Sequence, residues 1–202
     1  MRHTFRSLCI YCGSSVGASP VYEQAARELA RVLADEKIDL VYGGGNIGLM
    51  GVIANEMLTL RRDVTGVIPE ALMKKEVGHL DLTQLHVVRN MHERKAMMAE
   101  LSDGFIAMPG GMGTLEELFE VLTWSQLGLH DKPIGLLNVN GFYDGLLDFM
   151  RHLVAQRFVK PAHAELLVHA NDPVTLLERM RSFEPKSASK WLDQDTARQI
   201  LP

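Results

Sequence analysis

The stretch PGGMGTLEE at residues 109–117 decides the fold of this chain and the place of its binding site. It follows the apolar run FIAM at residues 105–108, which is typical of a buried strand. Apolar side chains then recur at helical spacing, at Leu115, Leu118, Phe119 and Leu122. The glycines therefore lie on a turn from a strand into a helix, where free backbone N–H groups and the helix dipole suit a phosphate. Glu117 falls in the first turn of this predicted helix, which places a carboxylate near the phosphate site.

Short apolar strands and amphipathic helices alternate along the rest of the chain. We expect strands at residues 7–12, 39–42, 63–68, 84–88, 104–108, 133–137 and near 166–169. We expect helices at about 20–36, 48–60, 91–101, from Thr114 onward, at 142–156 and at 173–180, the last with Asp172 as its N-cap. This alternation predicts an α/β fold, a Rossmann-like doubly wound parallel sheet of six to seven strands with helices on both faces. We expect one domain over residues 1–183 and a polar C-terminal tail over 184–202.

Composition narrows the class of protein. The chain has 202 residues with 21 Lys and Arg against 25 Asp and Glu, a formal net charge of −4. This balance argues against a general nucleic-acid-binding protein. No apolar run approaches the roughly 20 residues of a membrane span, and the N-terminal residues lead directly into a strand without a secretory signal. We therefore expect a cytoplasmic protein with neither nucleic acid nor a membrane as its partner.

The two cysteines and the histidines give little sign of redox or metal chemistry. Cys9 and Cys12 form a C-x-x-C pattern, which suits either a redox pair or two buried thiols. Residues three apart on a strand point to opposite faces, which favours buried thiols. The eight histidines show neither H-E-x-x-H nor H-x-H, so no metal site is predicted.

Three of the turns that follow predicted strands carry glycines, at residues 13–17, 43–51 and 109–117. In a parallel sheet these turns share one edge, the edge at which such folds bind ligands. The sequence therefore predicts a nucleotide or phosphosugar site there. The second turn also contains G-x-G-x-x-G, with Glu70 about 20 residues on, which leaves a dinucleotide enzyme as an alternative. That turn follows the second strand rather than the first, which counts against the alternative.

Two charged groups are expected at this edge, and each also has a structural explanation. Thr114 and Glu117 fit a capping box, in which Glu117 would only complete the start of the helix. Arg94 and Lys95 open the preceding helix at the same edge, where a cation opposes the helix dipole unless a phosphate or Glu117 offsets it. The alternative is an exposed pair of cations. Glu120 lies one turn beyond Glu117 on a similar face and is expected to share the site.

Together these motifs resemble the Lonely Guy (LOG) proteins, which are cytokinin riboside 5′-monophosphate phosphoribohydrolases. The resemblance rests on P-G-G-x-G-T-x-x-E at residues 109–117, M-x-x-R-K at 91–95 and G-G-G-x-x-G-L-M-G at 43–51. It extends over about residues 7–180. It implies hydrolysis of the N-glycosidic bond of adenosine 5′-monophosphates, with or without an N6 substituent, to the free base and ribose 5-phosphate. No cofactor is implied, and the chain would form a homodimer with its pocket near the subunit interface.

The resemblance also assigns residues. It implies Arg94 and Glu117 as the catalytic pair, and substrate contacts from Glu76, Lys95, Gly111, Met112, Gly113, Thr114, Leu115, Glu116 and Thr123. To these the turns and the helix face add Gly13, Ser14, Gly44, Gly45, Gly110 and Glu120. Relatives have also been labelled lysine decarboxylases, but no residue here indicates a Schiff-base lysine or a pyridoxal phosphate site. The alternative function is a non-catalytic nucleotide or cofactor carrier, and the presence of both Arg94 and Glu117 favours the enzyme.

Overall fold

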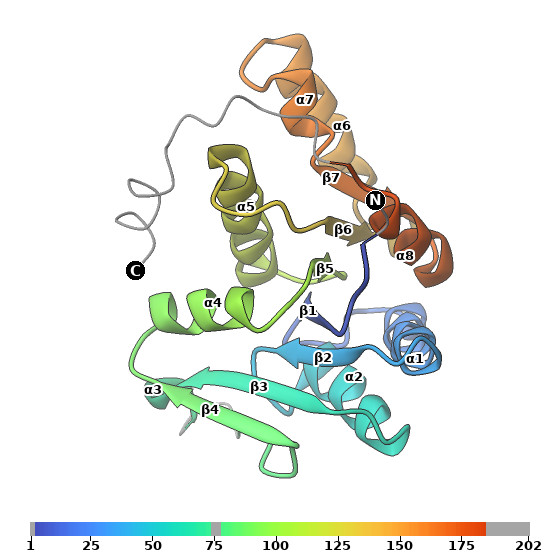
Figure 1. Cartoon of the computed structure of the whole chain (residues 1–202). Helices are drawn as coiled ribbons and strands as arrows, with labels where there is room; N and C mark the ends of the chain where they lie inside the picture. Colours follow the sequence, from blue (N-terminus) through green and yellow to red (C-terminus); the bar gives the residue numbers. More distant parts are fainter. Residues whose placement is uncertain (1–2, 74–77, 185–202) are drawn as a thin grey trace.

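The computed structural model describes residues 3–73 and 78–184 (Figure 1). Its strands are β1 (Ser7–Tyr11), β2 (Asp39–Tyr42), β3 (Val64–Pro69), β4 (Gln84–Val88), β5 (Phe105–Ala107), β6 (Ile134–Leu137) and β7 (Leu167–Ala170). Its longer helices are α1 (Pro20–Asp35), α2 (Gly48–Thr59), α4 (Met91–Glu100), α5 (Met112–Leu127), α6 (Asp144–Ala155) and α8 (Pro173–Arg181). Two short helices, α3 (Glu70–Met73) and α7 (Pro161–Ala164), and a 3-10 turn at Val139–Gly141 were not expected from the sequence.

Within the described residues, seven strands form one sheet in the order β4-β3-β2-β1-β5-β6-β7, and all six pairs of neighbouring strands are parallel. The chain builds outward from β1 to β4, then returns to pair β5 with the other side of β1. The predicted doubly wound α/β fold is thus confirmed. Since β1 and β5 are neighbours whose connections leave in opposite directions, the crevice beyond their carboxyl ends is the expected place for a ligand.

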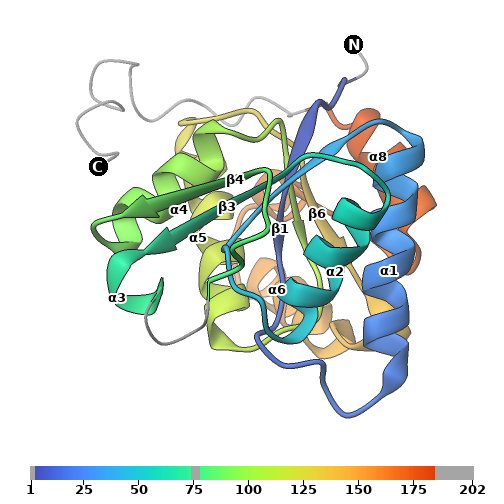
Figure 2. The ribbon, with the colours of Figure 1, turned by 90° about the horizontal axis from the view of Figure 1, so that it is seen from below.

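Each face of the sheet has its own hydrophobic core, and the strands divide their side chains between the two. In β1, Leu8 and Ile10 pack into one core, whereas Cys9 and Tyr11 pack into the other, as alternation along a strand requires. Helices α1, α2 and α8 cover the first face, and α4, α5 and the start of α6 cover the second (Figure 2). Cys9 and Cys12 are free and buried in opposite cores, and burial raises the pKa of both thiols.

Local sequence signals set most helix ends. Ser19, Asn90 and Asp172 cap α1, α4 and α8 by accepting a hydrogen bond from a backbone N–H in the first turn. Asp172 thus confirms the predicted N-cap. Gly128 ends α5 at a φ of 78°, in the left-handed conformation that glycine adopts without strain. Among the helices that the structure describes, none is long and apolar enough to cross a membrane.

The predicted start of α5 is wrong. The helix begins at Met112 with Gly111 as its N-cap, so Thr114 is not the N-cap and lies inside the first turn. Glu117 is then the sixth helical residue, beyond the first turn and out of place for a capping box. The cause is local, because the Thr114 side chain occupies the space where Gly110 lacks a Cβ and is buried there.

Candidate active site

The three glycine turns meet directly at the carboxyl edge of the sheet. The backbone N–H of Gly13 donates to the carbonyl of Pro109 at 3.1 Å, and that of Leu49 donates to the carbonyl of Gly13 at 3.0 Å. Gly48 has a φ of +59°, and a Cβ there would overlap the backbone of Ser14. The predicted convergence of the turns at one edge is therefore what the structure has.

A cavity of about 290 Å³ opens where these turns converge. Eight residues predicted for the site line it, namely Gly13, Ser14, Arg94, Gly111, Met112, Gly113, Thr114 and Glu117. Four further lining residues were missed, namely Cys12, Met50, Leu72 and Met91. Three of the four stand inside or beside the motifs, but they are neither glycines nor charged residues, the two types that indicated the site. Leu72 belongs to α3, whose presence the sequence did not signal.

The wall that α5 contributes suits an anion. Among the described side chains, none caps the first turn of α5, so its backbone N–H groups remain available to a ligand. A Cβ added at Gly111 or Gly113 would meet no atom within 4 Å. The protein's own packing therefore does not require glycine at these two positions. The missing side chains instead leave open space beside the helix N-terminus.

Arg94 and Glu117 face each other at the cavity. Nη1 of Arg94 lies 2.9 Å from Oε1 of Glu117, and their side chains are only 11% and 10% exposed. Nε of Arg94 also donates to the Val67 carbonyl at 3.1 Å. A Cβ at Gly43 would overlap Nη2 of Arg94, so this glycine makes room for the guanidinium. Gly43 belongs to one of the glycine motifs but was not predicted as a site residue. The arginine that fills its space comes from a helix distant in the sequence.

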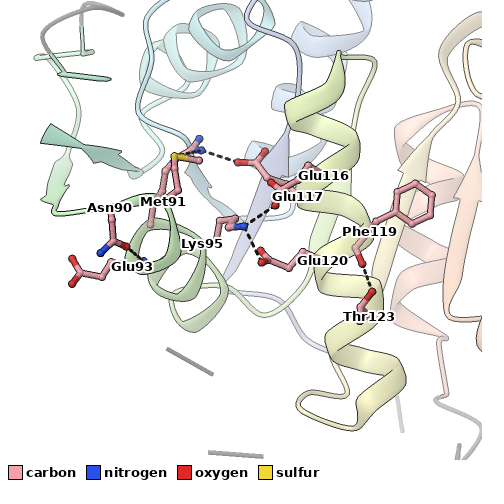
Figure 3. A network of polar contacts seen from close by, with 10 residues as sticks. Asn90, Met91, Glu93, Lys95, Glu116, Glu117, Phe119, Glu120 and Thr123 are labelled. Atoms are coloured by element: carbon pink, nitrogen blue, oxygen red, sulfur yellow. Dashed lines mark hydrogen bonds and ion pairs between the residues drawn. The ribbon is translucent and has the colours of Figure 1, made fainter. Parts of the chain in front are cut away.

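The electrostatics of Glu117 reflect its burial. Loss of solvent raises the pKa of the Glu117 carboxyl above its ordinary value, and the charge of Arg94 opposes that rise. Glu116 and Glu120 raise the pKa further, whereas Lys95 lowers it. Figure 3 shows the three carboxylates of this stretch, Glu116, Glu117 and Glu120, on the side of α5 that faces α4. The buried pair is thus a carboxylate held next to a cation, in the cavity beside the uncapped start of α5.

Known proteins with similar sequences show which family this chain belongs to. The model of a family described as possible lysine decarboxylase matches residues 50–180. A probable cytokinin riboside 5′-monophosphate phosphoribohydrolase of Oryza sativa subsp. japonica is 47% identical over 186 residues, which are 92% of this chain and 74% of that protein. A cytokinin riboside 5′-monophosphate phosphoribohydrolase of Arabidopsis thaliana is 47% identical over 182 residues, 90% of this chain and 85% of that protein. The chain belongs to the Lonely Guy (LOG) family.

The fold of this LOG-family chain also occurs among solved structures of lower similarity. The molybdenum cofactor binding protein from Rippkaea orientalis superposes with a TM-score of 0.63, at 22% identity, over 87% of this chain and 95% of that one. At that level of identity the likeness concerns the fold alone.

The predicted substrate contact Lys95 forms ion pairs with two other predicted contacts, Glu116 and Glu120, beside the cavity. Nζ of Lys95 lies 2.7 Å from Oε1 of Glu116 and 2.8 Å from Oε1 of Glu120 (Figure 3). The Lys95 side chain is 10% exposed. These contacts link α4 to α5 beside the Arg94–Glu117 pair. Lys95 follows Arg94 in the sequence, Glu116 precedes Glu117, and Glu120 lies about one helical turn beyond Glu117.

The other predicted residues that the structure describes do not line the cavity at Arg94 and Glu117. Gly110 borders a second cavity of about 240 Å³ with apolar walls that include Val16, Tyr22, Leu49 and Phe142. Gly44 packs against Ile68 of β3 and Leu85 of β4, and Gly45 pairs with Gly78, which precedes β4. Leu115 packs into the core under α5, and the Thr123 hydroxyl donates to the Phe119 carbonyl further along the helix. Glu76 lies outside the described residues.

Proposed function

We propose that this protein hydrolyses the N-glycosidic bond of nucleoside 5′-monophosphates, releasing the free base and ribose 5-phosphate. The expected substrates are adenosine 5′-monophosphates, including those with an N6 substituent. The observation that carries the proposal is the buried Arg94–Glu117 pair, 2.9 Å apart, beside an uncapped helix start. The names of relatives that are 47% identical to this chain, cytokinin riboside 5′-monophosphate phosphoribohydrolases, support it.

The 5′-phosphate would bind at the start of α5. The backbone N–H groups of residues 111–114 and the positive end of the helix dipole attract an anion. The space beside Gly111 and Gly113 allows the phosphate oxygens to approach the backbone. A ligand anchored there has its ribose near Glu117, one turn further along the helix.

The chemistry follows from the charge that develops at the ribose. When the bond from C1′ to the base breaks, its electron pair leaves with the base, and positive charge builds on C1′ and the ring oxygen, as in glycoside hydrolysis. The Glu117 carboxylate stabilises this charge and accepts a proton from the attacking water, whose oxygen bonds to C1′. The departing base takes up one proton from solvent and Glu117 releases the proton of the water to solvent, so one water is consumed for each bond broken. Arg94 stays protonated near neutral pH, so it orients Glu117 and the substrate rather than donating a proton.

A product assay tests the proposal. Purified protein would be incubated with AMP and, separately, with isopentenyladenosine monophosphate, and both free base and ribose 5-phosphate would be measured. We expect the two products in equal amounts from at least one substrate. Binding of both nucleotides without release of either product would contradict the proposal and favour a carrier.

Replacing the catalytic carboxylate gives the largest loss that we predict. We expect Glu117→Gln to lower kcat by about 10³-fold, since a positioned charge or base contributes on the order of 10² to 10⁴. The matched control is Glu36→Gln, which removes an exposed carboxylate paired with Arg181 at the other edge of the sheet. Full activity in Glu117→Gln, with a normal circular dichroism spectrum, would remove Glu117 from the mechanism.

We further propose that the protein is a homodimer, as the family resemblance implies, and that it is cytoplasmic, as expected from its sequence. Light scattering on the purified chain should give twice its mass of 22.5 kDa, or about 45 kDa. A mass of one chain at micromolar concentration would contradict the dimer, and cell fractionation tests the compartment.

A further inference from the structure

The Lys95 ammonium forms ion pairs with two carboxylates of the protein. It lies 2.7 Å from Glu116 and 2.8 Å from Glu120, and its side chain is 10% exposed. Lys95 is not among the residues that line the catalytic cavity in the described part of the chain. A buried cation that already has two partners is a poor candidate for a direct contact with the substrate phosphate, because it would have to give up both ion pairs.

Lys95 and Arg94 act on the same stretch of α5 from adjacent positions on α4. Arg94 contacts Glu117, and Lys95 contacts the carboxylates on either side of it, Glu116 and Glu120 (Figure 3). The two cations therefore bridge the same two helices side by side. A rotation of α5 that broke the Lys95 pairs would also carry Glu117 away from Arg94.

The charges around Glu117 are nearly in balance only when Lys95 is counted. Arg94 and Lys95 face it from α4, and Glu116 and Glu120 flank it on α5. The titratable side chains near it on β1 and directly after it, Cys9, Tyr11 and Cys12, stay neutral because burial raises the pKa of each. Without Lys95, three carboxylates would share one cation.

We propose that Lys95 is a positioning residue of the hydrolase, which fixes Glu117 against Arg94 and offsets the charge of Glu116 and Glu120, rather than a substrate contact. This inference rests on the proposed function for its catalytic meaning. The ion pairs at 2.7 and 2.8 Å carry it. Like charges close to a carboxylate favour its protonated form, so loss of Lys95 would leave less ionised Glu117 at a given pH.

The first test is the pH dependence of kcat at saturating AMP in Lys95→Met, which removes the charge and keeps the length of the side chain. We expect kcat at pH 7 to fall about tenfold, KM to change less than twofold, and the acid limb to move up by about one pH unit. Lys95→Arg should retain the wild-type limb. Adding Glu116→Gln and Glu120→Gln to Lys95→Met should move the limb back toward its original position.

Lys132→Met is the matched control, a lysine that precedes β6 and contacts the other end of α4. Nζ of Lys132 donates to the carbonyls of Ala99 at 2.7 Å and Ser102 at 2.6 Å, at the far end of α4. Its loss should lower the melting temperature without moving the acid limb. A rise in KM of tenfold or more in Lys95→Met, with kcat and the limb unchanged, would overturn the inference and make Lys95 a substrate contact.

A second readout does not depend on turnover. Protein labelled with ¹³C at the glutamate carboxyls would be titrated by NMR, with the Glu117 signal assigned from Glu117→Gln. We expect this signal to titrate at higher pH in Lys95→Met than in the wild type. If the wild type cleaves no nucleotide but the signal shifts, the proposed function fails and the influence of Lys95 on Glu117 stands. If the wild type cleaves AMP and the signal does not shift, the inference alone fails.

Discussion

The glycine turns at residues 43–51 and 109–117 lie at the same edge of the sheet but differ in what surrounds their glycines. In the first turn, Gly43 faces the guanidinium of Arg94, Gly44 packs on Ile68, and Gly48 packs on the backbone of a neighbouring turn. In the second turn, Gly111 and Gly113 have no atom within 4 Å of where a Cβ would stand. Gly110 is the exception there, because Thr114 fills its space.

The difference separates two uses of the same residue type. The first turn lacks side chains so that the protein can pack against itself, and one result is a fixed position for Arg94. The second turn lacks side chains where no protein atom needs the space, next to a helix start that no described side chain caps. We infer that the first turn positions catalytic machinery and that the second receives the ligand.

Gly43→Ala should have the larger effect on activity. Its Cβ would displace the guanidinium that contacts Glu117, and a displacement of about 1 Å at a catalytic group can cost on the order of 10²-fold in rate. We therefore expect kcat for AMP to fall about 10²-fold. Steady-state kinetics beside Gly145→Ala, an open position in α6, measures this. A kcat within twofold of wild type would show that Arg94 does not depend on this turn.

Gly113→Ala should separate stability from binding. Gly113 and Gly145 are both second residues of a helix, and neither has an atom within 4 Å of its missing Cβ. Alanine should stabilise the protein at each position by up to about 1 kcal/mol, which raises the melting temperature by about 2–4 °C. Only Gly113→Ala should also raise KM for AMP, by about tenfold, because its methyl group enters the phosphate site. Equal KM values in the two variants would refute the ligand role of Gly113.

The smallest effect near neutral pH concerns the protonation of Glu117. Burial raises its pKa above the ordinary value of 4.5, and the mechanism needs the ionised form. Activity should therefore be full at neutral pH and decline as the pH falls through this raised pKa. We expect the midpoint of the acid limb of kcat, at saturating AMP, to lie above pH 4.5. A flat profile down to pH 4.5 would show that the buried carboxylate does not limit the rate.

The sequence was sufficient for the sheet and for the edge that carries the site, because short apolar runs and glycine turns are local patterns. It also indicated that Arg94 and Glu117 belong to one site, since both follow closely on helix starts at that edge. It failed at the start of α5, where Thr114 imitates an N-cap but fills the space beside Gly110. Local spacing does not reveal such a contact.

The sequence also did not predict which residues distant along the chain contact each other. Lys95, Glu116 and Glu120 were each expected to contact substrate, and their ion pairs with one another in the structure were not foreseen. Which cation takes which carboxylate depends on how α4 and α5 lie against each other. The role of Gly43 was not predicted for the same reason, because its neighbour Arg94 belongs to α4, about 50 residues further along the chain.

The most direct test of the phosphate site at residues 109–117 compares kcat/KM for AMP with that for adenosine. Hydrogen bonds to a charged group contribute about 1.5–3 kcal/mol each, so three of them at the helix start correspond to about 10³-fold or more. We therefore predict that AMP is hydrolysed at least about 10³-fold more efficiently than adenosine, and that Gly113→Ala narrows this ratio. Equal efficiency for the two substrates would contradict the account.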